Sequence, residues 1–187
     1  PWHQRLGYRL FRNPVVMFGV GPLWSLLIGP RVWAGSKPGP LRNSILLEDR
    51  IIASDPNPQR RQLFEQRFHI TTTDDNRHLV RESYMILLAV KPQQYRDAVH
   101  DFANLVREDH LIVSIMAGVS TRKLEECFPQ IKARVVRAMP NLASHVGAGM
   151  AGVCAGRYAS EADLLRAQRI FDAGGKSVHI EDEALMD

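Results

Sequence analysis

Three short turns of small, rigid or polar residues follow apolar segments of the sequence. They are Ala89-Val90-Lys91-Pro92, Met116-Ala117-Gly118 and Met139-Pro140-Asn141. The carboxyl ends of parallel strands are where open α/β sheets bind ligands. If each apolar segment is such a strand, the three turns are well placed to meet a ligand. They offer it, in chain order, a lysine, a stretch without bulky side chains and an amide side chain. Lys91 alone carries little weight, because a lysine after a buried strand is commonly just the first solvated residue.

Two glycines near the start of the sequence fit a dinucleotide site. The apolar segment 15–18 predicts a buried strand, Gly19-Val20-Gly21 follows it, and residues 23–28 could start a helix. In such a fingerprint the glycines allow a tight turn and let a pyrophosphate approach the backbone. Pro22 is acceptable in the first turn of a helix. Trp24 departs from the pattern, because it stands where a small residue lets the helix pack closely on the strand.

Asp55 follows another predicted strand, at residues 50–54. An acid at this place is the usual partner of the adenosine ribose hydroxyls. Asp55 could equally cap the turn Asp55-Pro56-Asn57, and the sequence leaves both readings open. A second glycine pattern, at residues 147–152, is interpreted as a chance match, because residues 153–155 continue as a strand and not as a helix.

Hydrophobic periodicity places these turns in an alternation of strands and helices. Residues 85–90 form an unbroken apolar run, which predicts a strand buried on both faces. Further strands are predicted at 69–71, 111–115, 132–138 and 176–180. Helices are predicted at 58–68 with Asn57 as N-cap, from Asp74, after Pro92, at 121–128 with Ser120 as N-cap, from Ser160, and just beginning at 183–187. The predicted fold class is α/β, with a doubly wound, mostly parallel Rossmann-like sheet and helices on both faces.

The composition narrows the functional classes. A chain of 187 residues with 45% apolar and 24% charged residues is typical of one globular domain. We place this domain at residues 15–187, after an N-terminal extension at 1–14. Residues 1–47 hold six Lys or Arg and no acid, whereas the rest is nearly balanced, so we expect no nucleic-acid face on the main body.

The histidine and cysteine spacings predict no metal site. No segment is long and apolar enough to predict a membrane span. Two cysteines far apart in the sequence favour a reduced intracellular compartment. We therefore expect a soluble cytoplasmic protein, although the acid-free, arginine-bearing residues 1–13 are also compatible with a mitochondrial transit segment.

Four segments of the sequence resemble a known family. They are Ala89–Gln93, Ser114–Val119, Arg137–Asn141 and, last, Glu183 with Leu185-Met186-Asp187. Their order and spacing resemble the N-terminal domain of the pyrroline-5-carboxylate reductase family, over residues 50–187 well and over 15–29 poorly. The resemblance implies reduction of 1-pyrroline-5-carboxylate to L-proline with NADPH or NADH, hence NADP or NAD as cofactor and a cyclic imino acid as small-molecule substrate.

The resemblance also implies which residues bind the cofactor. Phe18, Gly19, Val20, Gly21, Pro22 and Leu23 would line the pyrophosphate. Asp55 would lie by the adenosine ribose and Asn76 near the adenosine. The ribose and nicotinamide would be bordered by two turns, which are Ala89, Val90, Lys91 and Pro92, and Met116, Ala117 and Gly118. Asn141 would lie near the nicotinamide. No catalytic residue is identifiable.

Departures from the family pattern leave other functions open. Trp24 replaces a small residue, residues 30–44 form a longer connection, and Asp55 stands where NADPH-using members tend to carry a small hydroxyl residue. The family continues past the position of Asp187 into a Ser/Gly-rich loop and a helical domain, which carries substrate binding and homo-oligomerisation. We therefore expect this chain to bind cofactor without turnover. The alternatives are a related hydroxy-acid dehydrogenase and a catalytically inactive dinucleotide-binding or interaction module.

Overall fold

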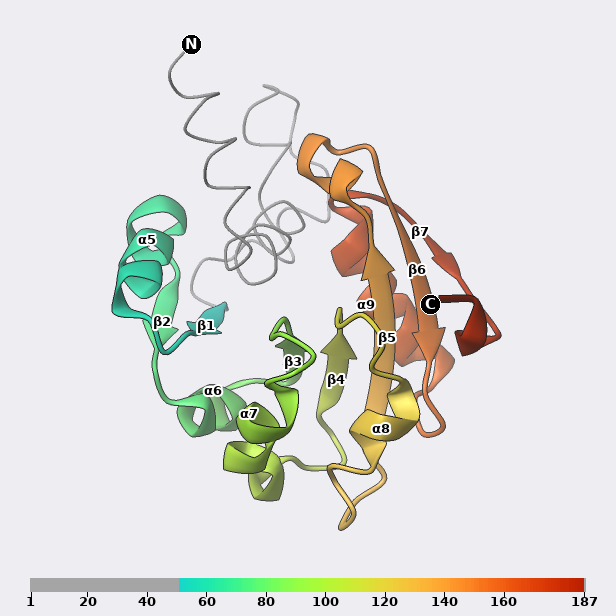
Figure 1. Cartoon of the computed structure of the whole chain (residues 1–187), viewed down its shortest axis with the longest axis horizontal. Helices are drawn as coiled ribbons and strands as arrows, with labels where there is room; N and C mark the ends of the chain where they lie inside the picture. Colours follow the sequence, from blue (N-terminus) through green and yellow to red (C-terminus); the bar gives the residue numbers. More distant parts are fainter. Residues whose placement is uncertain (1–50, 187) are drawn as a thin grey trace.

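The computed structural model describes residues 51–186, in which strands and helices alternate (Figure 1). The predicted strand at 15–18, the glycines that follow it, Trp24 and the boundary between residues 14 and 15 lie outside the described residues. The elements, in chain order, are β1 (Ile52–Ser54), α5 (Pro58–Phe68), β2 (Thr71–Thr73), α6 (Asn76–Glu82), β3 (Met85–Leu88), α7 (Tyr95–Phe102), η2 (Ala103–Leu105), β4 (Leu111–Ser114), α8 (Thr121–Glu125), β5 (Arg134–Pro140), η3 (Leu142–Val146), β6 (Gly149–Ala155), α9 (Glu161–Asp172), β7 (Gly175–His179) and η4 (Glu183–Met186).

The strands form two sheets, and most of the strand pairs are parallel. A small sheet pairs β1 with β2, and a five-stranded sheet has the order β3-β4-β5-β6-β7. The pairs β3·β4, β4·β5 and β6·β7 are parallel, whereas β6 returns antiparallel to β5. The predicted mostly parallel α/β fold is therefore confirmed.

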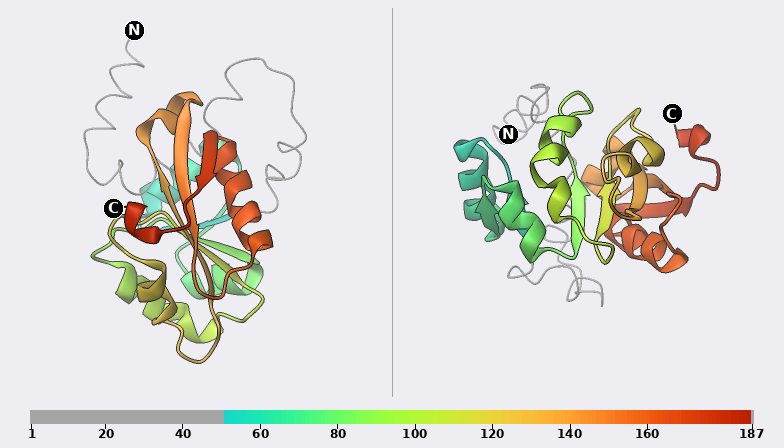
Figure 2. Two further views of the ribbon diagram at one scale, coloured as in Figure 1. Left: turned by 90° about the vertical axis from the view of Figure 1, so that its right-hand side faces the viewer. Right: turned by 90° about the horizontal axis from the view of Figure 1, so that it is seen from below.

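Helices cover both faces of the five-stranded sheet (Figure 2). On one face Ile86, Ile112 and Val135 pack with residues of α7 and α8 around Phe128. On the other face Val113, Val136 and Val153 pack against Leu164, Ala167 and Phe171 of α9. This alternation follows from the period of a strand, in which successive side chains point to opposite faces. The predicted arrangement of helices on both faces is confirmed.

The helix starts follow the predicted capping residues. The Asn57 side chain accepts hydrogen bonds from the Gln59 and Arg60 amides, with Pro58 in the first turn of α5. The Ser120 side chain accepts from the Lys123 amide at the start of α8. Ser160 and Asp163 form a capping box at the start of α9. A side-chain acceptor at the N-cap satisfies an amide that has no partner within the helix.

Several strand boundaries differ from the prediction. The predicted strand 85–90 ends at Leu88, and in it only Ile86 and Leu88 are buried, because β3 lies at the edge of the described sheet. The predicted strand 132–138 is β5, Arg134–Pro140, so Met139 and Pro140 continue the strand instead of closing it. Pairing with β6 accounts for this extension, since Met139 and Pro140 stand opposite Gly152 and Ala151.

Other elements are displaced or shorter than predicted. The strand expected at 69–71 is β2, Thr71–Thr73, and the strand expected at 50–54 begins at Ile52. The helix expected at 121–128 is α8, which ends at Glu125. The helix expected to begin at 183–187 is the 3-10 helix η4, Glu183–Met186.

Candidate functional site

The carboxyl ends of β3 and β4 lie at one edge of the sheet, and β5, parallel to them, continues past that edge to Pro140. β3, β4 and β5 lie side by side, and the turns after β3 and β4 lie next to each other (Figure 1). A hydrogen bond from the Ile115 amide to the Leu88 carbonyl, 3.2 Å long, joins the first residue after β4 to the last residue of β3. The structure therefore brings the first two predicted turns together at the edge where such sheets bind ligands.

The turn after β3 carries the predicted residues Ala89 to Pro92. It is closed by a 2.9 Å hydrogen bond from the Gln94 amide to the Lys91 carbonyl. All four residues are partly exposed, whereas Tyr95 at the start of α7 is buried and anchors the turn. Backbone and side-chain atoms of this turn are therefore accessible beside the end of β4.

The loop after β4 carries Met116, Ala117 and Gly118. The buried Met116 donates its amide to Ser114 Oγ, 3.2 Å away, while Ala117 and Gly118 are exposed. Gly118 has a φ of +68° and open space where a Cβ would lie. Glycine is therefore needed here for its backbone conformation and not for lack of room. The exposed, uncrowded backbone at Ala117 and Gly118 leaves room for a flat ligand.

Asn141 follows β5 and is exposed, but its side chain has a structural partner. The Asn141 Oδ1 accepts a hydrogen bond from the Met150 amide at 3.1 Å, and the Asn141 amide donates to the Met150 carbonyl at 3.2 Å. These two bonds hold β6 against the end of β5. The contact of Asn141 with a ligand stays a prediction.

Asp55 and Asn76 lie together at the carboxyl end of β1, where Ser54 joins them. The Ser54 hydroxyl donates to Asn76 Oδ1 at 2.7 Å. Asp55 Oδ1 accepts from the Asn57 amide at 2.8 Å, and Asp55 Oδ2 accepts from Arg60 Nη1 at 3.2 Å. Asp55 therefore caps the turn, as one of the two readings expected. A role at a ribose stays a prediction and would have to share the carboxylate with Arg60.

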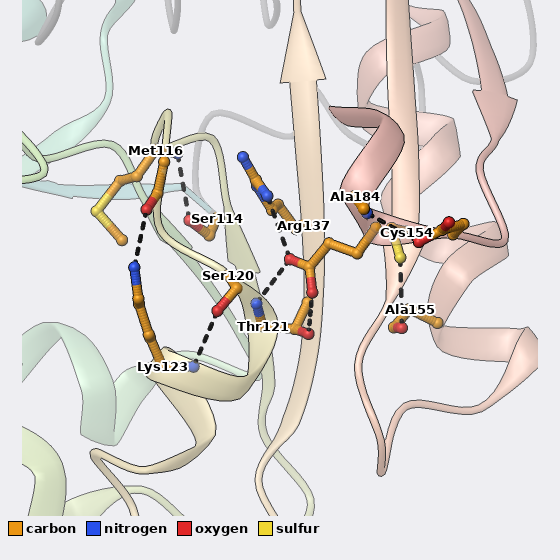
Figure 3. Close-up of polar contacts among 12 residues, drawn as sticks. Ser114, Met116, Ser120, Thr121, Lys123, Arg137, Cys154, Ala155 and Ala184 are labelled. Atoms are coloured by element: carbon orange, nitrogen blue, oxygen red, sulfur yellow. Dashed lines mark hydrogen bonds and ion pairs between the residues drawn. The ribbon is translucent and has the colours of Figure 1, made fainter. Parts of the chain in front are cut away.

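One cluster was not assigned a role from the sequence: Glu183 with Thr121 and Arg137 (Figure 3). Glu183 Oε1 accepts from the Thr121 amide at 2.7 Å and from Arg137 Nη1 at 3.3 Å. Glu183 Oε2 accepts from the Thr121 hydroxyl at 2.7 Å. Arg137 is completely buried in β5. Arg137, between the apolar pairs Val135-Val136 and Ala138-Met139, was the available signal, because a buried charge needs a partner.

The neighbouring Cys154 and Glu125 have pKa values that reflect burial. Burial, followed by the charge of Glu183, raises the pKa of the Cys154 thiol, which donates to the Ala155 carbonyl at 3.6 Å. The thiol is therefore protonated near neutral pH and is a poor nucleophile. Burial also raises the pKa of the Glu125 carboxyl, although this carboxylate accepts a 2.7 Å hydrogen bond from the Arg157 amide.

Residues 51–186 contain no group of three or more His, Cys, Asp or Glu side chains arranged to hold a metal ion. In the same range no helix has the length and apolar character needed to cross a membrane. Phe18 to Leu23, expected at the pyrophosphate, lie outside the described residues.

Comparison with known proteins shows which families this chain resembles. Residues 37–118 match the family described as "NADP oxidoreductase coenzyme F420-dependent". The pyrroline-5-carboxylate reductase of Haemophilus influenzae is 36% identical over 138 residues, which are 74% of this chain and 50% of that protein. The chain is a relative of the pyrroline-5-carboxylate reductases. The resemblance found in the sequence is therefore confirmed, and the chain spans about half the length of the curated relatives it matches.

Solved structures of pyrroline-5-carboxylate reductases are also similar to this chain. A pyrroline-5-carboxylate reductase from Coxiella burnetii superposes with a TM-score of 0.72 at 27% identity, covering 78% of this chain and 54% of that one. The Plasmodium falciparum pyrroline carboxylate reductase, solved with NADP bound, has a TM-score of 0.65 at 21% identity, covering 78% of this chain and 52% of that one. The chain thus shares the Rossmann-like fold of these reductases.

Proposed function

We propose that this chain is the dinucleotide-binding part of a pyrroline-5-carboxylate reductase, which reduces 1-pyrroline-5-carboxylate to L-proline with NADPH or NADH. The observation that carries the proposal is the identity of 36% with a named reductase over 74% of the chain. The adjacent turns after β3 and β4 support the proposal, because they lie at the carboxyl edge of a parallel sheet, where such sheets bind ligands.

The described residues fit a nicotinamide dinucleotide. The exposed backbone at Ala117 and Gly118 and the open space beside Gly118 suit a flat ring. Lys91 and Pro92 would border the ribose, and Asp55 and Asn76 would face the adenosine half at the end of β1. The two halves of an extended dinucleotide would thus lie along the carboxyl edges of both sheets.

The cofactor, when bound, supplies the hydride that reduces the imine carbon. The residues of this chain would position the cofactor, with Ala117 and Gly118 beside its nicotinamide end. We assign no residue of this chain to proton transfer. The small-molecule partner is the cyclic imino acid, and a reducing intracellular compartment, cytoplasmic or mitochondrial, is the setting that we propose for the reaction.

Binding of NADPH and NADH to the 187-residue chain, measured by isothermal titration calorimetry, tests the proposal. Lys91→Ala should weaken binding about fivefold, because a lost hydrogen bond contributes about 1 kcal/mol. Lys132→Ala is the matched control, since Lys132 is exposed on the segment before β5, at the opposite edge of the sheet. Absence of binding by the wild-type chain, or equal losses in the two variants, would contradict the proposal.

A further inference from the structure

Glu183 joins three elements that are distant in the sequence. It belongs to η4, and its carboxylate meets Thr121 at the start of α8 and Arg137 in the middle of β5. The partners lie 62 and 46 residues earlier in the chain. Figure 3 labels Thr121 of α8, Arg137 of β5 and Ala184 of η4, which lie around these contacts.

The carboxylate is well matched to its partners. Both oxygens accept hydrogen bonds, two from Thr121 at 2.7 Å and one from the Arg137 guanidinium at 3.3 Å. A completely buried arginine such as Arg137 is stable only when its charge is compensated. The Glu183 carboxylate therefore links Thr121 at the start of α8 to the buried Arg137 of β5.

Thr121 sets one end of the loop between β4 and α8. The other end is set by the Met116 amide on Ser114 Oγ, and the loop passes through the positive φ of Gly118. Lys123 Nζ, one turn into α8, donates to the Gly118 carbonyl at 3.4 Å. With both ends held, the exposed residues Ala117 and Gly118 have a defined position at the edge of the sheet.

We propose that Glu183 is a positioning residue for cofactor binding: through Thr121 it fixes the Met116–Gly118 loop against which the nicotinamide half lies. The inference rests on the proposed function. It predicts a local effect, on the nicotinamide half only, whereas a purely structural role of Glu183 would affect the adenosine half equally.

The experiment compares two ligands on the 187-residue chain, NADH or NADPH and the fragment 5′-AMP. In Glu183→Gln the Kd for the whole cofactor should rise about tenfold, because a charge-assisted anchor is lost, while the Kd for 5′-AMP stays unchanged. The fluorescence of bound NADH, which reports the surroundings of the nicotinamide, should shift toward that of free NADH.

Thr121 provides a second pair of variants in case Glu183→Gln does not fold. Thr121→Val removes only the hydroxyl that donates to Glu183 Oε2, and should weaken binding of the whole cofactor without affecting 5′-AMP. Thr121→Ser keeps the hydroxyl and should restore wild-type affinity. The control is Asp163→Asn, which disturbs a buried carboxylate paired with Arg134 and Arg166 at the start of α9. It should leave both Kd values unchanged.

The outcomes are distinct. Equal weakening for the whole cofactor and 5′-AMP, or unchanged affinity in both Glu183→Gln and Thr121→Val, would overturn the inference and leave the proposed function standing. A wild-type chain that binds neither NADPH nor NADH would overturn the proposed function and this inference together.

Discussion

Asp55 brings a negative charge to the carboxyl end of β1, and Arg60 partly offsets it. The two side chains form a 3.2 Å ion pair and are 20% and 25% exposed, respectively. Arg61, the next residue, donates to the Asp55 carbonyl at 2.7 Å. A carboxylate accepts hydrogen bonds from ribose hydroxyls but repels the 2′-phosphate of NADPH. The balance between Asp55 and Arg60 should therefore set the preference for one cofactor over the other.

Asp55→Ser should shift the ratio of the Kd values for NADH and NADPH toward NADPH. We expect a change of about fivefold, because a partly exposed charge contributes about 1 kcal/mol. Arg60→Ala should shift the ratio the opposite way, since it leaves the Asp55 charge uncompensated. Calorimetric titration of both cofactors measures the ratio, and an identical ratio in the two variants and the wild type would show that Asp55 lies away from the ribose.

Single residues differ in how far the sequence reveals their role. Asp55 and Asn76 were expected near the adenosine, and the structure places them together at the end of β1. The contact between Glu183 and Thr121 was not predictable, because no local pattern links residues 62 positions apart. Arg137 gave a partial signal: its buried charge required an acid, but the sequence did not say which one.

At the scale of elements, helix starts were more predictable than strand ends. A helix start depends on local hydrogen bonds, such as those that Asn57 and Ser160 accept. The donors and acceptors of these bonds are only a few residues apart, so the sequence shows them directly. The residue at which a strand ends depends on the neighbouring strand that pairs with it, which can be distant in the sequence. β5 reaches Pro140 because β6 pairs with it, although Pro140 itself was expected to form a rigid turn.

The turn before β4 contains a titratable group that the fold buries. His110 Nδ1 accepts from the Arg107 amide at 3.1 Å, and the His110 Nε2 has no hydrogen-bond partner among residues 51–186. Burial, followed by the charge of Arg107, lowers the pKa of His110 below its ordinary value of 6.5. The neutral imidazole is therefore the form that the folded turn stabilises.

The free energy of unfolding should decrease as the pH falls below about 6.5, the ordinary pKa of a histidine. Below that pH the unfolded chain binds a proton that the folded chain does not, so protons favour unfolding until the pH reaches the lowered pKa of the folded state. Urea titrations between pH 5 and 8 measure this slope. His110→Asn keeps an acceptor for the Arg107 amide and should flatten the slope; an unchanged slope would assign it to another group.

At the scale of the whole molecule, the fold class followed from the alternation of strands and helices, but the order of the strands in the sheet did not. The order β3-β4-β5 brings together the turns after β3 and β4, which the sequence separates, and α7 and α8 pack on one face of this sheet while α9 packs on the other. The antiparallel β6 was not predicted, because a strand's direction relative to its neighbour is not encoded in its own residues.

Among residues 51–186, the loop at the carboxyl end of β4 exposes Ala117 and Gly118, and the chain spans about half the length of the curated reductases it matches. In the proposed function these two exposed residues border the nicotinamide, but two small residues on one side of the ring would not orient an imine against it. Lost orientation can account for about 7–11 kcal/mol of a reaction barrier.

We therefore expect the purified 187-residue polypeptide to bind NADPH or NADH without measurable oxidation of either by 1-pyrroline-5-carboxylate. Joining it to the part of the Haemophilus influenzae relative that it does not match should restore some turnover, followed by the loss of cofactor absorbance. Turnover by the 187-residue polypeptide alone, at ordinary enzyme rates of about 1–10³ s⁻¹, would instead locate the substrate site within this domain.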